Sequence, residues 1–381
     1  MRSPRFRPRR YRLKAAPAAA VREGHPWVYR DKLSSVTEKF ADGQWLELLD
    51  PHDGIVGYGI YHREGGVGIR VLGPTLPDVR ETVAQAVRRR RKLQNETDAY
   101  RVINGENDGL PGVVLDVYAG WGVLQTYQPG VDSLGRYAAA LACQQLELRG
   151  LVWKLPHRRI GPGADMARIL RGHPPDVVEF HEGSLQLSAD LLAGQKSGTF
   201  LDLRGLRRWL RRQPLEKTAV LNLFAYTGMA GLAACAAGAA MVVNVDAAQP
   251  SLDFGARHHA HPAQRWVCAD IFRWLSTPDS VRYDLIIVDP PCMAYTMAQV
   301  PKALAAYRKL YTSVARRLKP GGRIVACCCT SRIAPAQFDS TLSSALPNMA
   351  IQERLPHEPD HRARFSEANY LKIVVLGPKR P

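Results

Sequence analysis

From Ala219 onward, short apolar runs alternate with helix-forming segments, and this alternation constrains the fold more than any other feature of the sequence. The apolar runs are AVLNLFAY, AMVVNVD, RWVCAD, YDLIIVDPP and GGRIVACCC. Apolar strands that alternate with helices form βαβ units, whose parallel sheet is buried on both faces. The sequence therefore predicts an α/β fold with a mostly parallel sheet for this part of the chain.

The remaining sequence divides into segments of different composition. Residues 1–10 form a basic tail, and residues 11–76 contain the β-like runs QWLELLD, IVGYGIYH and VGIRVL, which predict a small β-rich module. Residues 77–182 begin with a helix from about Asp78 to Gln94, which we expect to link modules and display positive charge, and continue as an α+β domain. Residues 183–381 begin with a hairpin in EGSLQLSADLLAGQKSGTF and continue into the α/β part.

The chain carries a formal net charge of +17, which favours a polyanionic partner. Nucleic acid is the first candidate, because Lys and Arg that neutralise phosphates release condensed counterions, and an anionic membrane surface is the second. The charge is clustered. The clusters are the basic tail with Arg2, Arg5 and Arg7, the run from Arg88 to Lys92, and the arginines Arg204, Arg207, Arg208, Arg211 and Arg212.

The lengths of the apolar stretches and the spacing of the cysteines indicate in which cellular compartment the protein works. No uninterrupted apolar stretch reaches the roughly 18 to 20 residues of a membrane span, so we expect no membrane insertion. The seven cysteines have no regular spacing and form no CxxC pair, which argues against a secreted disulfide scaffold and against a zinc site. We therefore expect a cytoplasmic protein without a bound metal.

Polar residues follow the predicted strands, at the sheet edge where ligands of open α/β proteins bind. Gly228, in LNLFAYTGMAG, lets the backbone approach a ligand and exposes amides of the next helix. Asp246 ends the second strand, where a carboxylate can accept hydrogen bonds from ribose hydroxyls. Asp270 ends the third strand and could receive an adenine amino group. Each aspartate could instead cap the following helix, and a lone glycine turn is common.

Three consecutive strands that end in this way favour a nucleoside-bearing cofactor over three independent caps. Neither GxGxxG nor GxxxxGK[ST] occurs in the sequence, which argues against a dinucleotide and against a P-loop nucleotide. S-adenosylmethionine has a ribose and an adenine but no phosphate. It is therefore the cofactor that the sequence predicts.

The fourth and fifth strands of this part end in an Asp-Pro-Pro turn and in three cysteines. In IIVDPPCM the two prolines lack amide hydrogens and fix a stiff turn, which would present Asp289 to the edge of a flat base. Cys327 and Cys329 share one face of their strand, and Cys328 points to the other. Free cysteines are most often buried packing residues. Beside an Asp-Pro-Pro turn and a methyl donor, however, a thiol suits nucleophilic activation of a pyrimidine.

That chemistry requires a nucleophile. Carbon 5 of cytosine is too electron-poor to take a methyl group directly. A thiolate that adds to carbon 6 makes carbon 5 nucleophilic, and a carboxyl group at the N3 and amino edge of the base assists. After methyl transfer a base removes the carbon-5 proton, and elimination frees the thiol.

Together these residues resemble the RlmI-like ribosomal RNA cytosine-5 methyltransferases, over nearly the whole chain beyond the tail. The motifs are REGHPWVYRDKL, NGENDGLPGVVLDVY, AGQKSGTFLDLR, LNLFAYTG, VDPP, the PGG turn with its cysteine-ended strand, and NYLK. The resemblance implies an N-terminal PUA-like domain, a central α+β domain, and a Rossmann-like class I methyltransferase domain with a mostly parallel seven-stranded sheet. It implies naked or partly assembled 23S ribosomal RNA as substrate, and it leaves a homodimer open.

The resemblance also implies site residues. Around the cofactor it places Gln195, Lys196, Phe200, Asp202, Arg204, Phe224, Tyr226, Gly228, Asp246, Asp270 and Asp289. It places the nucleophile at Cys329, with Cys327 as the alternative, and Asp289 against the base. The chain departs from the family at Cys292, where lysine is usual. This cysteine resembles that of the Asp-x-Pro-Cys motif in another RNA cytosine methyltransferase group, where a second cysteine assists product release.

Two other functions stay open. A related methyltransferase domain that modifies guanine at N7 shares the Gln-Lys-Ser/Thr-Gly and Asn-Leu-Phe motifs but needs no thiol, because N7 has its own lone pair. An RNA-binding or ribosome-assembly protein that had lost catalysis would use the same PUA-like module and basic runs. Cofactor binding and the reactivity of Cys329 distinguish these functions.

Overall fold

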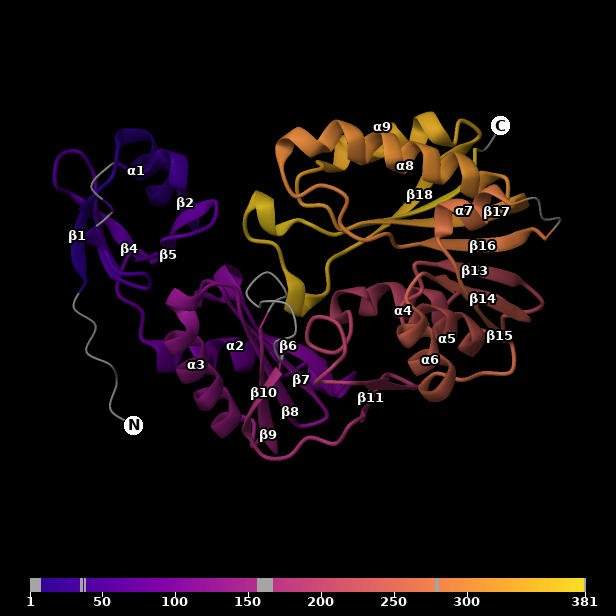
Figure 1. Ribbon diagram of the computed structural model, residues 1–381, viewed down its shortest axis with the longest axis horizontal. Coiled ribbons are helices and arrows are strands. Elements are labelled where there is room, and N and C mark those ends of the chain that lie inside the picture. The colour runs from indigo at the N-terminus through magenta and orange to yellow at the C-terminus, as the bar shows by residue number, and fades with distance from the viewer. Residues whose placement is uncertain (1–7, 35–36, 38, 156–166, 278–280, 380–381) are drawn as a thin grey trace. The chain divides into compact units, whose positions relative to one another are not determined.

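The structure is a computed structural model, and it describes residues 8–34, 37, 39–155, 167–277 and 281–379 (Figure 1). The chain forms two compact units. The first comprises residues 1–201 and 359–361, and the second comprises residues 202–358 and 362–381. Within the described ranges, no helix is both long enough and apolar enough to cross a membrane. Arg2, Arg5 and Arg7 of the basic tail lie outside the described residues.

The first unit begins with a five-stranded sheet in the order β1-β3-β4-β5-β2. Its elements are β1 (Arg9–Arg12), α1 (Ala15–Arg22), β2 (Trp27–Tyr29), β3 (Trp45–Leu49), β4 (Ile55–Tyr61) and β5 (Val67–Gly73). The three runs predicted as strands are β3, β4 and β5. Leu46, Leu48 and Ile69 are fully buried and form part of its core. Because β1 pairs in parallel with β3, Arg9 and Arg10 belong to this sheet, although they were expected in the tail.

The first unit continues with a second five-stranded sheet, in the order β10-β9-β8-β7-β6. Its elements are α2 (Val79–Arg90), β6 (Ala99–Asn104), β7 (Val113–Tyr118), β8 (Trp121–Thr126), α3 (Asp132–Gln145), β9 (Gly150–Lys154) and β10 (Ala167–Arg171). The α3 helix connects β8 to β9, the one parallel pair recorded between these strands. Its residues Leu134, Ala138 and Ala142 pack into the core. The predicted helix and α+β pattern are confirmed.

A hairpin of β11 (Val178–Glu182) and β12 (Leu185–Ala189) ends this unit's regular structure. The hairpin lies earlier than the sequence suggested, because the chain folds into turns directly after β12. The Asp190 side chain accepts hydrogen bonds from the amides of Leu192 and Ala193, at 2.9 and 2.7 Å, and these bonds start the turns. The second half of the predicted hairpin is therefore not a strand.

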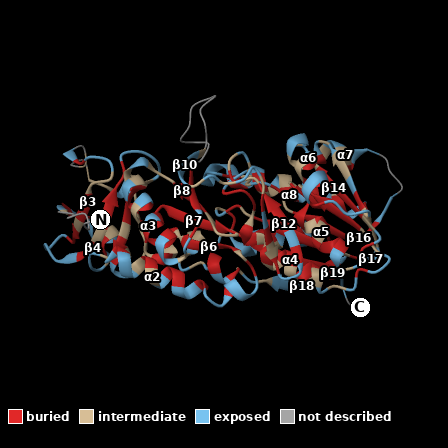
Figure 2. Cartoon of the chain, turned by 90° about the horizontal axis from the view of Figure 1, so that it is seen from below, coloured by how far each residue is buried: buried red, intermediate tan, exposed pale blue. Residues whose placement is uncertain are grey.

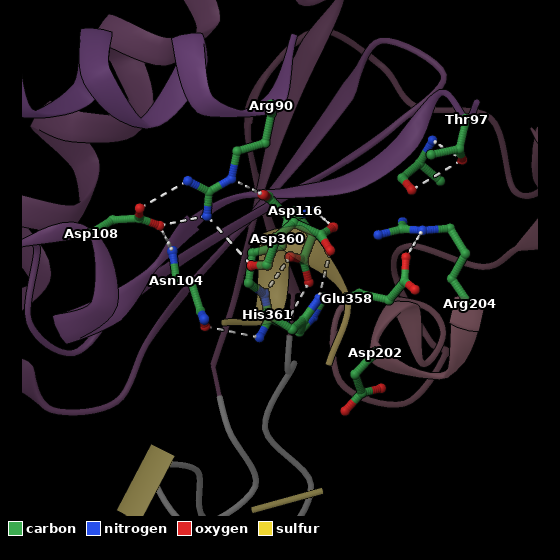
Figure 3. A network of polar contacts seen from close by, with 12 residues as sticks. Arg90, Thr97, Asn104, Asp108, Asp116, Asp202, Arg204, Glu358, Asp360 and His361 are labelled. Atoms are coloured by element: carbon green, nitrogen blue, oxygen red, sulfur yellow. Dashed lines mark hydrogen bonds and ion pairs between the residues drawn. The ribbon is translucent and has the colours of Figure 1, made fainter. Parts of the chain in front are cut away.

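The basic run at the end of α2 is largely paired within its own unit (Figure 3). Arg90 is buried, and its guanidinium donates to both carboxylate oxygens of Asp108 at 2.8 and 2.6 Å. Arg89 donates to the same carboxylate at 2.7 Å, and Arg88 donates to Glu81 at 2.6 Å. Three of the five basic residues of the run from Arg88 to Lys92 are therefore paired with acids, and the charge that this run displays is smaller than expected.

Replacing Asp108 with Asn is expected to lower the free energy of unfolding by about 3 to 5 kcal/mol, because it leaves Arg90 buried without its counter-charge. Burial raises the pKa of Asp108, but the hydrogen bonds and charges of Arg90, the Asn104 amide and the charge of Arg89 outweigh burial and hold it below its usual value of 3.8. A lowered folded-state pKa means that this carboxylate stabilises the fold above about pH 3.9 and loses that contribution as the pH falls.

Urea unfolding followed by circular dichroism at pH 7 and pH 3 tests this prediction. The difference between wild type and Asp108→Asn should be large at pH 7 and shrink at pH 3. Asp53→Asn is the control, because Asp53 pairs with Arg12 at an exposed site and should contribute less than about 1 kcal/mol. The account would be contradicted if both variants lost the same free energy of unfolding. It would also be contradicted if the difference between wild type and Asp108→Asn were the same at pH 7 and pH 3.

The second unit contains a seven-stranded sheet in the order β15-β14-β13-β16-β17-β19-β18. Its strands are β13 (Ala219–Leu223), β14 (Met241–Asp246), β15 (Gln264–Cys268), β16 (Tyr283–Val288), β17 (Leu318–Cys328), β18 (Met349–Leu355) and β19 (Lys372–Pro378). The first five strands in this order are parallel to their neighbours, while β19 pairs antiparallel with β17 and β18. Figure 2 shows the inner strands β14, β16 and β19 as mostly buried, whereas the edge strands β15 and β18 are mostly intermediate or exposed. The predicted mostly parallel sheet is confirmed.

Helices connect these strands, as the alternating sequence predicts. They are α4 (Arg204–Arg211), α5 (Met229–Ala236), α6 (Gln249–His258), α7 (Ile271–Ser276), α8 (Val300–Ala315) and α9 (Pro335–Ala345). The strand order reverses next to β13, because β14 and β15 lie on one side of it and β16 and β17 on the other. Such a switch point is where an open α/β sheet binds its ligand, at the carboxyl ends of the strands.

The arginines of α4 are mostly internal. Arg204 and Arg207 are each only 2% exposed. The Arg204 Nε donates to Glu358 at 2.8 Å, and Arg208 donates to the other oxygen of the same carboxylate at 2.6 Å. The ion pairs with Glu358 therefore hold α4 in place. The spacing of the arginines suggested an exposed basic cluster, but Arg204 and Arg207 are buried.

Candidate active site

The turn after β13 contains three residues with left-handed backbone. Phe224, Tyr226 and Gly228 have φ values of +59°, +51° and +72°. For a residue with a side chain this conformation costs roughly 1 to 2 kcal/mol, and it persists where the surroundings enforce it. Here the Tyr226 amide donates to Asp246 at 2.8 Å, and the Ala225 amide donates to the Val245 carbonyl at 3.1 Å. The end of β14 therefore fixes the shape of this turn.

Asp246 binds the turn with one carboxylate oxygen and the chain after β14 with the other. Its Oδ2 accepts from the Tyr226 amide, and its Oδ1 accepts from the Ala248 amide at 2.9 Å. Asp246 is half-buried, and it is not the N-cap of α6, because Ala248 holds that position. Each carboxylate oxygen has a second lone pair, so the group can still accept hydrogen bonds from a ribose.

Asp270 does cap a helix. It is the N-cap of α7, and its Oδ1 accepts from the Arg273 amide at 2.8 Å. The capping role that the sequence left open is therefore present. A contact between Asp270 and an adenine stays a prediction.

A chain of hydrogen-bonded, buried amide side chains lies behind the turn. It was not predicted from the sequence. Asn222 on β13 donates to Asn244 on β14 at 2.9 Å, and Asn244 donates to Gln264 on β15 at 2.6 Å. Gln264 in turn donates to the His259 carbonyl at 2.7 Å. The His259 Nδ1 lies 2.7 Å from the Thr227 carbonyl, which only accepts, so Nδ1 carries a hydrogen. These hydrogen bonds connect β13, β14 and β15 to the turn. In the sequence, the network could have been recognised from the polar residues that interrupt the apolar strands.

The Asp-Pro-Pro turn and the end of the cysteine strand lie side by side. The Cys329 thiol donates to the Pro290 carbonyl at 3.6 Å, and the Met293 amide donates to the Thr330 hydroxyl at 3.2 Å. The amide of Asp289 lies 3.4 Å from the Leu223 carbonyl, which ties the turn to β13. The Asp-Pro-Pro turn and the end of the cysteine strand, both of which the sequence predicted to take part in the reaction, therefore lie together at one edge of the sheet.

The three adjacent cysteines differ in burial. Cys327 and Cys328 are fully buried, whereas Cys329 follows the last residue of β17 and is half-buried. Burial, with the negative charge of Asp289, raises the pKa of Cys327 well above its usual value. Cys327 is therefore an inaccessible and protonated thiol, and Cys329 is the member of the three that can reach a substrate. Cys292 is also half-buried, and its thiol donates to the Ala294 carbonyl at 3.4 Å.

The predicted site residues fall into three groups. At the carboxyl edge of the seven-stranded sheet lie Phe224, Tyr226, Gly228, Asp246, Asp270, Asp289, Cys292 and Cys329. Asp202 and Arg204 belong to the same unit, where Asp202 accepts from the Tyr370 hydroxyl at 2.5 Å and Arg204 binds Glu358. Gln195, Lys196 and Phe200 belong to the first unit, where the Lys196 ammonium lies 4.2 Å from the centre of the Phe200 ring. The cofactor and substrate contacts of all three groups stay predictions.

Comparison with known proteins identifies the family. The model of the S-adenosylmethionine-dependent methyltransferases matches residues 112–376, and a PUA-like domain model matches residues 12–73. The chain belongs to the S-adenosylmethionine-dependent methyltransferase family. The predicted cofactor and the predicted PUA-like module are thereby confirmed.

Relatives of this methyltransferase extend over nearly its whole length. The ribosomal RNA large subunit methyltransferase of Deinococcus radiodurans is 32% identical, over 96% of this chain and 97% of its own. The ribosomal RNA large subunit methyltransferase I of Alteromonas mediterranea is 26% identical, over 93% and 95%. These comparisons give no support to the homodimer that the sequence left open.

Solved structures share the fold of this methyltransferase. SMU.776, a methyltransferase complexed with SAH, and a SAM-dependent methyltransferase from Streptococcus mutans each superpose with a TM-score of 0.85. Each is 20% identical, and the match covers 97% of this chain and 100% of the other. The Asp246 carboxylate fits the family's cofactor, because its oxygens can still accept hydrogen bonds from the hydroxyl groups of a ribose.

Replacing Gly228 with Ala is expected to weaken S-adenosylmethionine binding to this methyltransferase by about tenfold to a hundredfold, which corresponds to roughly 1.4 to 2.8 kcal/mol. Gly228 has a φ of +72°, and a Cβ there would lie 2.4 Å from the Cη2 atom of Trp266. Because both would have to shift, the turn could not keep its shape.

Isothermal titration calorimetry with S-adenosylmethionine measures this effect. Gly238→Ala is the matched control, because Gly238 also has a positive φ of +90°, but it follows α5 and its Cβ would meet Glu216 at 3.2 Å. The control should lose some stability and keep its affinity. Equal affinities in wild type and Gly228→Ala would contradict the assigned role of the turn.

Proposed function

We propose that this methyltransferase transfers a methyl group to carbon 5 of a cytosine in 23S ribosomal RNA, with Cys329 as the nucleophile. The observation that carries the proposal is the half-buried Cys329 thiol beside the Asp-Pro-Pro turn, while the two neighbouring cysteines are buried. The substrate class is supported by the relatives named ribosomal RNA large subunit methyltransferases.

The proposed reaction depends on a temporary bond between the protein and the base. Bound S-adenosylmethionine supplies an electrophilic methyl group. The Cys329 thiolate adds to carbon 6, and the electrons of the carbon 5–carbon 6 double bond become available at carbon 5. Carbon 5 would bond to the methyl group while the methyl–sulfur bond breaks, with S-adenosylhomocysteine as the leaving group. A base then removes the carbon-5 proton, the double bond forms again, and the sulfur leaves as thiolate.

Asp289 and Cys292 have supporting roles in this proposal. The backbone of Asp289 lies within 3.4 Å of the Leu223 carbonyl, so its carboxyl group is held at the sheet edge, where it would contact N3 and the amino group of the base. When this carboxyl group is protonated, its hydrogen bond to N3 withdraws electrons from the ring and assists addition at carbon 6. Cys292 lies just beyond the two prolines and would assist the elimination that frees Cys329.

The substrate must reach this edge of the sheet. A base in a duplex cannot be attacked at carbon 6, so the target cytosine would be unpaired or flipped out. Naked or partly assembled ribosomal RNA offers such bases, and a net charge of +17 favours its binding.

A transfer assay tests the product. The enzyme is incubated with methyl-labelled S-adenosylmethionine and 23S ribosomal RNA from cells that lack this protein, and the RNA is digested to nucleosides. The proposal predicts label in 5-methylcytidine. Label in 7-methylguanosine would replace the proposal with the guanine alternative, and RNA binding without any transfer would indicate an RNA-binding protein without catalysis.

A further inference from the structure

Lys372 is a buried lysine next to the three cysteines. It is the first residue of β19, where it pairs across the strands with Cys328 of β17, and it is 7% exposed. Its ammonium donates three hydrogen bonds to backbone carbonyls, to Thr330 at 2.7 Å, to Tyr370 at 2.8 Å and to Ile333 at 3.1 Å. An ammonium has three donors, so all of them are used.

The charge of Lys372 is not neutralised by an acid in the described part of the chain, where no ion pair of Lys372 is recorded. Burial lowers the pKa of Lys372, and the negative charge that the thiols of Cys328 and Cys329 can carry acts in the opposite direction. Burying a cation among neutral carbonyls costs free energy. That cost decreases when an anion forms nearby, and the Cys329 thiolate is such an anion.

We propose that Lys372 is a positioning residue for Cys329, which fixes the segment after this cysteine and stabilises its thiolate by charge. The inference rests on the proposed function of Cys329. Since Thr330 directly follows Cys329 and its hydroxyl accepts from the Met293 amide, Lys372 connects the cysteine strand to the Asp-Pro-Pro turn through one residue. Lys372 has no free donor for the substrate, so it acts through Cys329.

Within the described residues, the charged groups that act on Lys372 and on Cys327 are thiols and carboxyl groups. Cys328 on β17 and Cys292 on the turn are the other thiols near Lys372. Tyr307 on α8 lies against them, and burial raises its pKa, so it stays neutral. On the side of the turn, an ionised Asp289 raises the pKa of Cys327 and so opposes a thiolate at that cysteine. Lys372 is thus the cation that these contacts place beside the cysteines.

Alkylation of Cys329 by iodoacetamide tests the inference, because only the thiolate reacts. The full-length protein without cofactor is alkylated between pH 5 and pH 10, and the modification of the Cys329 peptide is followed by mass spectrometry. Lys372→Met should shift the midpoint of the rate profile up by about one pH unit, the effect of losing one nearby opposite charge, and slow alkylation at pH 7 about tenfold. Lys372→Arg, which keeps the charge, should stay near the wild-type midpoint.

Matched measurements separate this role from a purely structural one. Lys319→Met is the control, because Lys319 binds Asp284 at a partly exposed site, and it should leave the profile unchanged. If Lys372→Met does not fold, as judged by circular dichroism, Lys372→Gln keeps a donor without the charge and should show the same shift. An unshifted midpoint in the folded neutral variant overturns the inference, as does an equal shift in Lys319→Met. The assay uses no RNA, so a failure of the cytosine assignment in the transfer assay is recognised separately.

Discussion

Replacing Cys329 with Ala is expected to reduce methyl transfer to RNA by roughly a thousandfold or more, in line with the losses seen when an enzyme's nucleophile is removed. Without the thiol no bond to carbon 6 forms, and carbon 5 of cytosine stays too electron-poor to take the methyl group. S-adenosylmethionine affinity should stay unchanged, because the cofactor's turn follows β13 and not β17. Single-turnover transfer of labelled methyl groups and calorimetry measure the two quantities.

Other cysteines provide the controls for this variant. Cys268→Ala changes the exposed cysteine that ends β15 and should transfer methyl groups at the wild-type rate. Cys327→Ala changes a buried neighbour and should affect stability more than chemistry. Undiminished transfer by Cys329→Ala would show that this thiol is not the nucleophile and would favour a base such as guanine, whose N7 needs none.

Replacing Asp246 with Ala is expected to weaken S-adenosylmethionine binding by about a hundredfold. The carboxylate accepts from the Tyr226 and Ala248 amides, so its loss removes both hydrogen bonds and releases a turn that holds left-handed residues. It also removes the acceptor assigned to the ribose. A hydrogen bond to a charged group contributes roughly 1.5 to 3 kcal/mol, and two such bonds account for an effect of this size.

Calorimetry with S-adenosylmethionine measures the loss, and Asp253→Ala is its control. Asp253 is exposed on α6 and accepts from Gln249 of the same helix, so its removal should not change the affinity. The RNA affinity of Asp246→Ala should be retained, because the change is local to the cofactor turn. An unchanged cofactor affinity would contradict the ribose assignment.

Many strands of both units could be predicted, because apolar runs set their positions directly, whereas β1, β2, β6, β10, β18 and β19 were not predicted. The alternation after Ala219 gave the parallel strands in their correct order along the chain, and the β-like runs near the amino terminus are β3, β4 and β5. The hairpin was misplaced because one side chain, Asp190, converts the following residues into turns. A pattern of apolar residues does not contain that information.

Charge was the least reliable signal, because the partner of an ionic side chain is decided by tertiary contacts. Arg204 meets a glutamate that lies 154 residues away, and Arg90 meets an aspartate 18 residues away. Both arginines are buried, although their spacing suggested exposed basic clusters. Lys372 could not be recognised from the sequence for the same reason. Its partners are backbone carbonyls, which every residue has, so no sequence pattern identifies them.

The site was predictable where topology fixes it. Residues that end parallel strands meet at one edge of the sheet, so Asp246, Asp289 and Cys329 could be grouped from the sequence. Because side chains alternate along a strand, Cys327 and Cys329 were predicted to lie on the same face, and alternation alone did not show which of them is accessible. The structure separates them, because β17 ends at Cys328 and only the cysteine after it is half-buried.

Trapping the covalent adduct tests the central claim most directly. In RNA that contains 5-fluorocytidine, carbon 5 carries fluorine in place of the proton whose removal frees the enzyme, so the bond between sulfur and carbon 6 should persist. With S-adenosylmethionine present, the account predicts a protein–RNA complex that survives denaturing electrophoresis, maps to Cys329 and is absent in Cys329→Ala. If the enzyme methylates ordinary RNA but forms no such complex with the fluorinated RNA, the thiol mechanism is wrong.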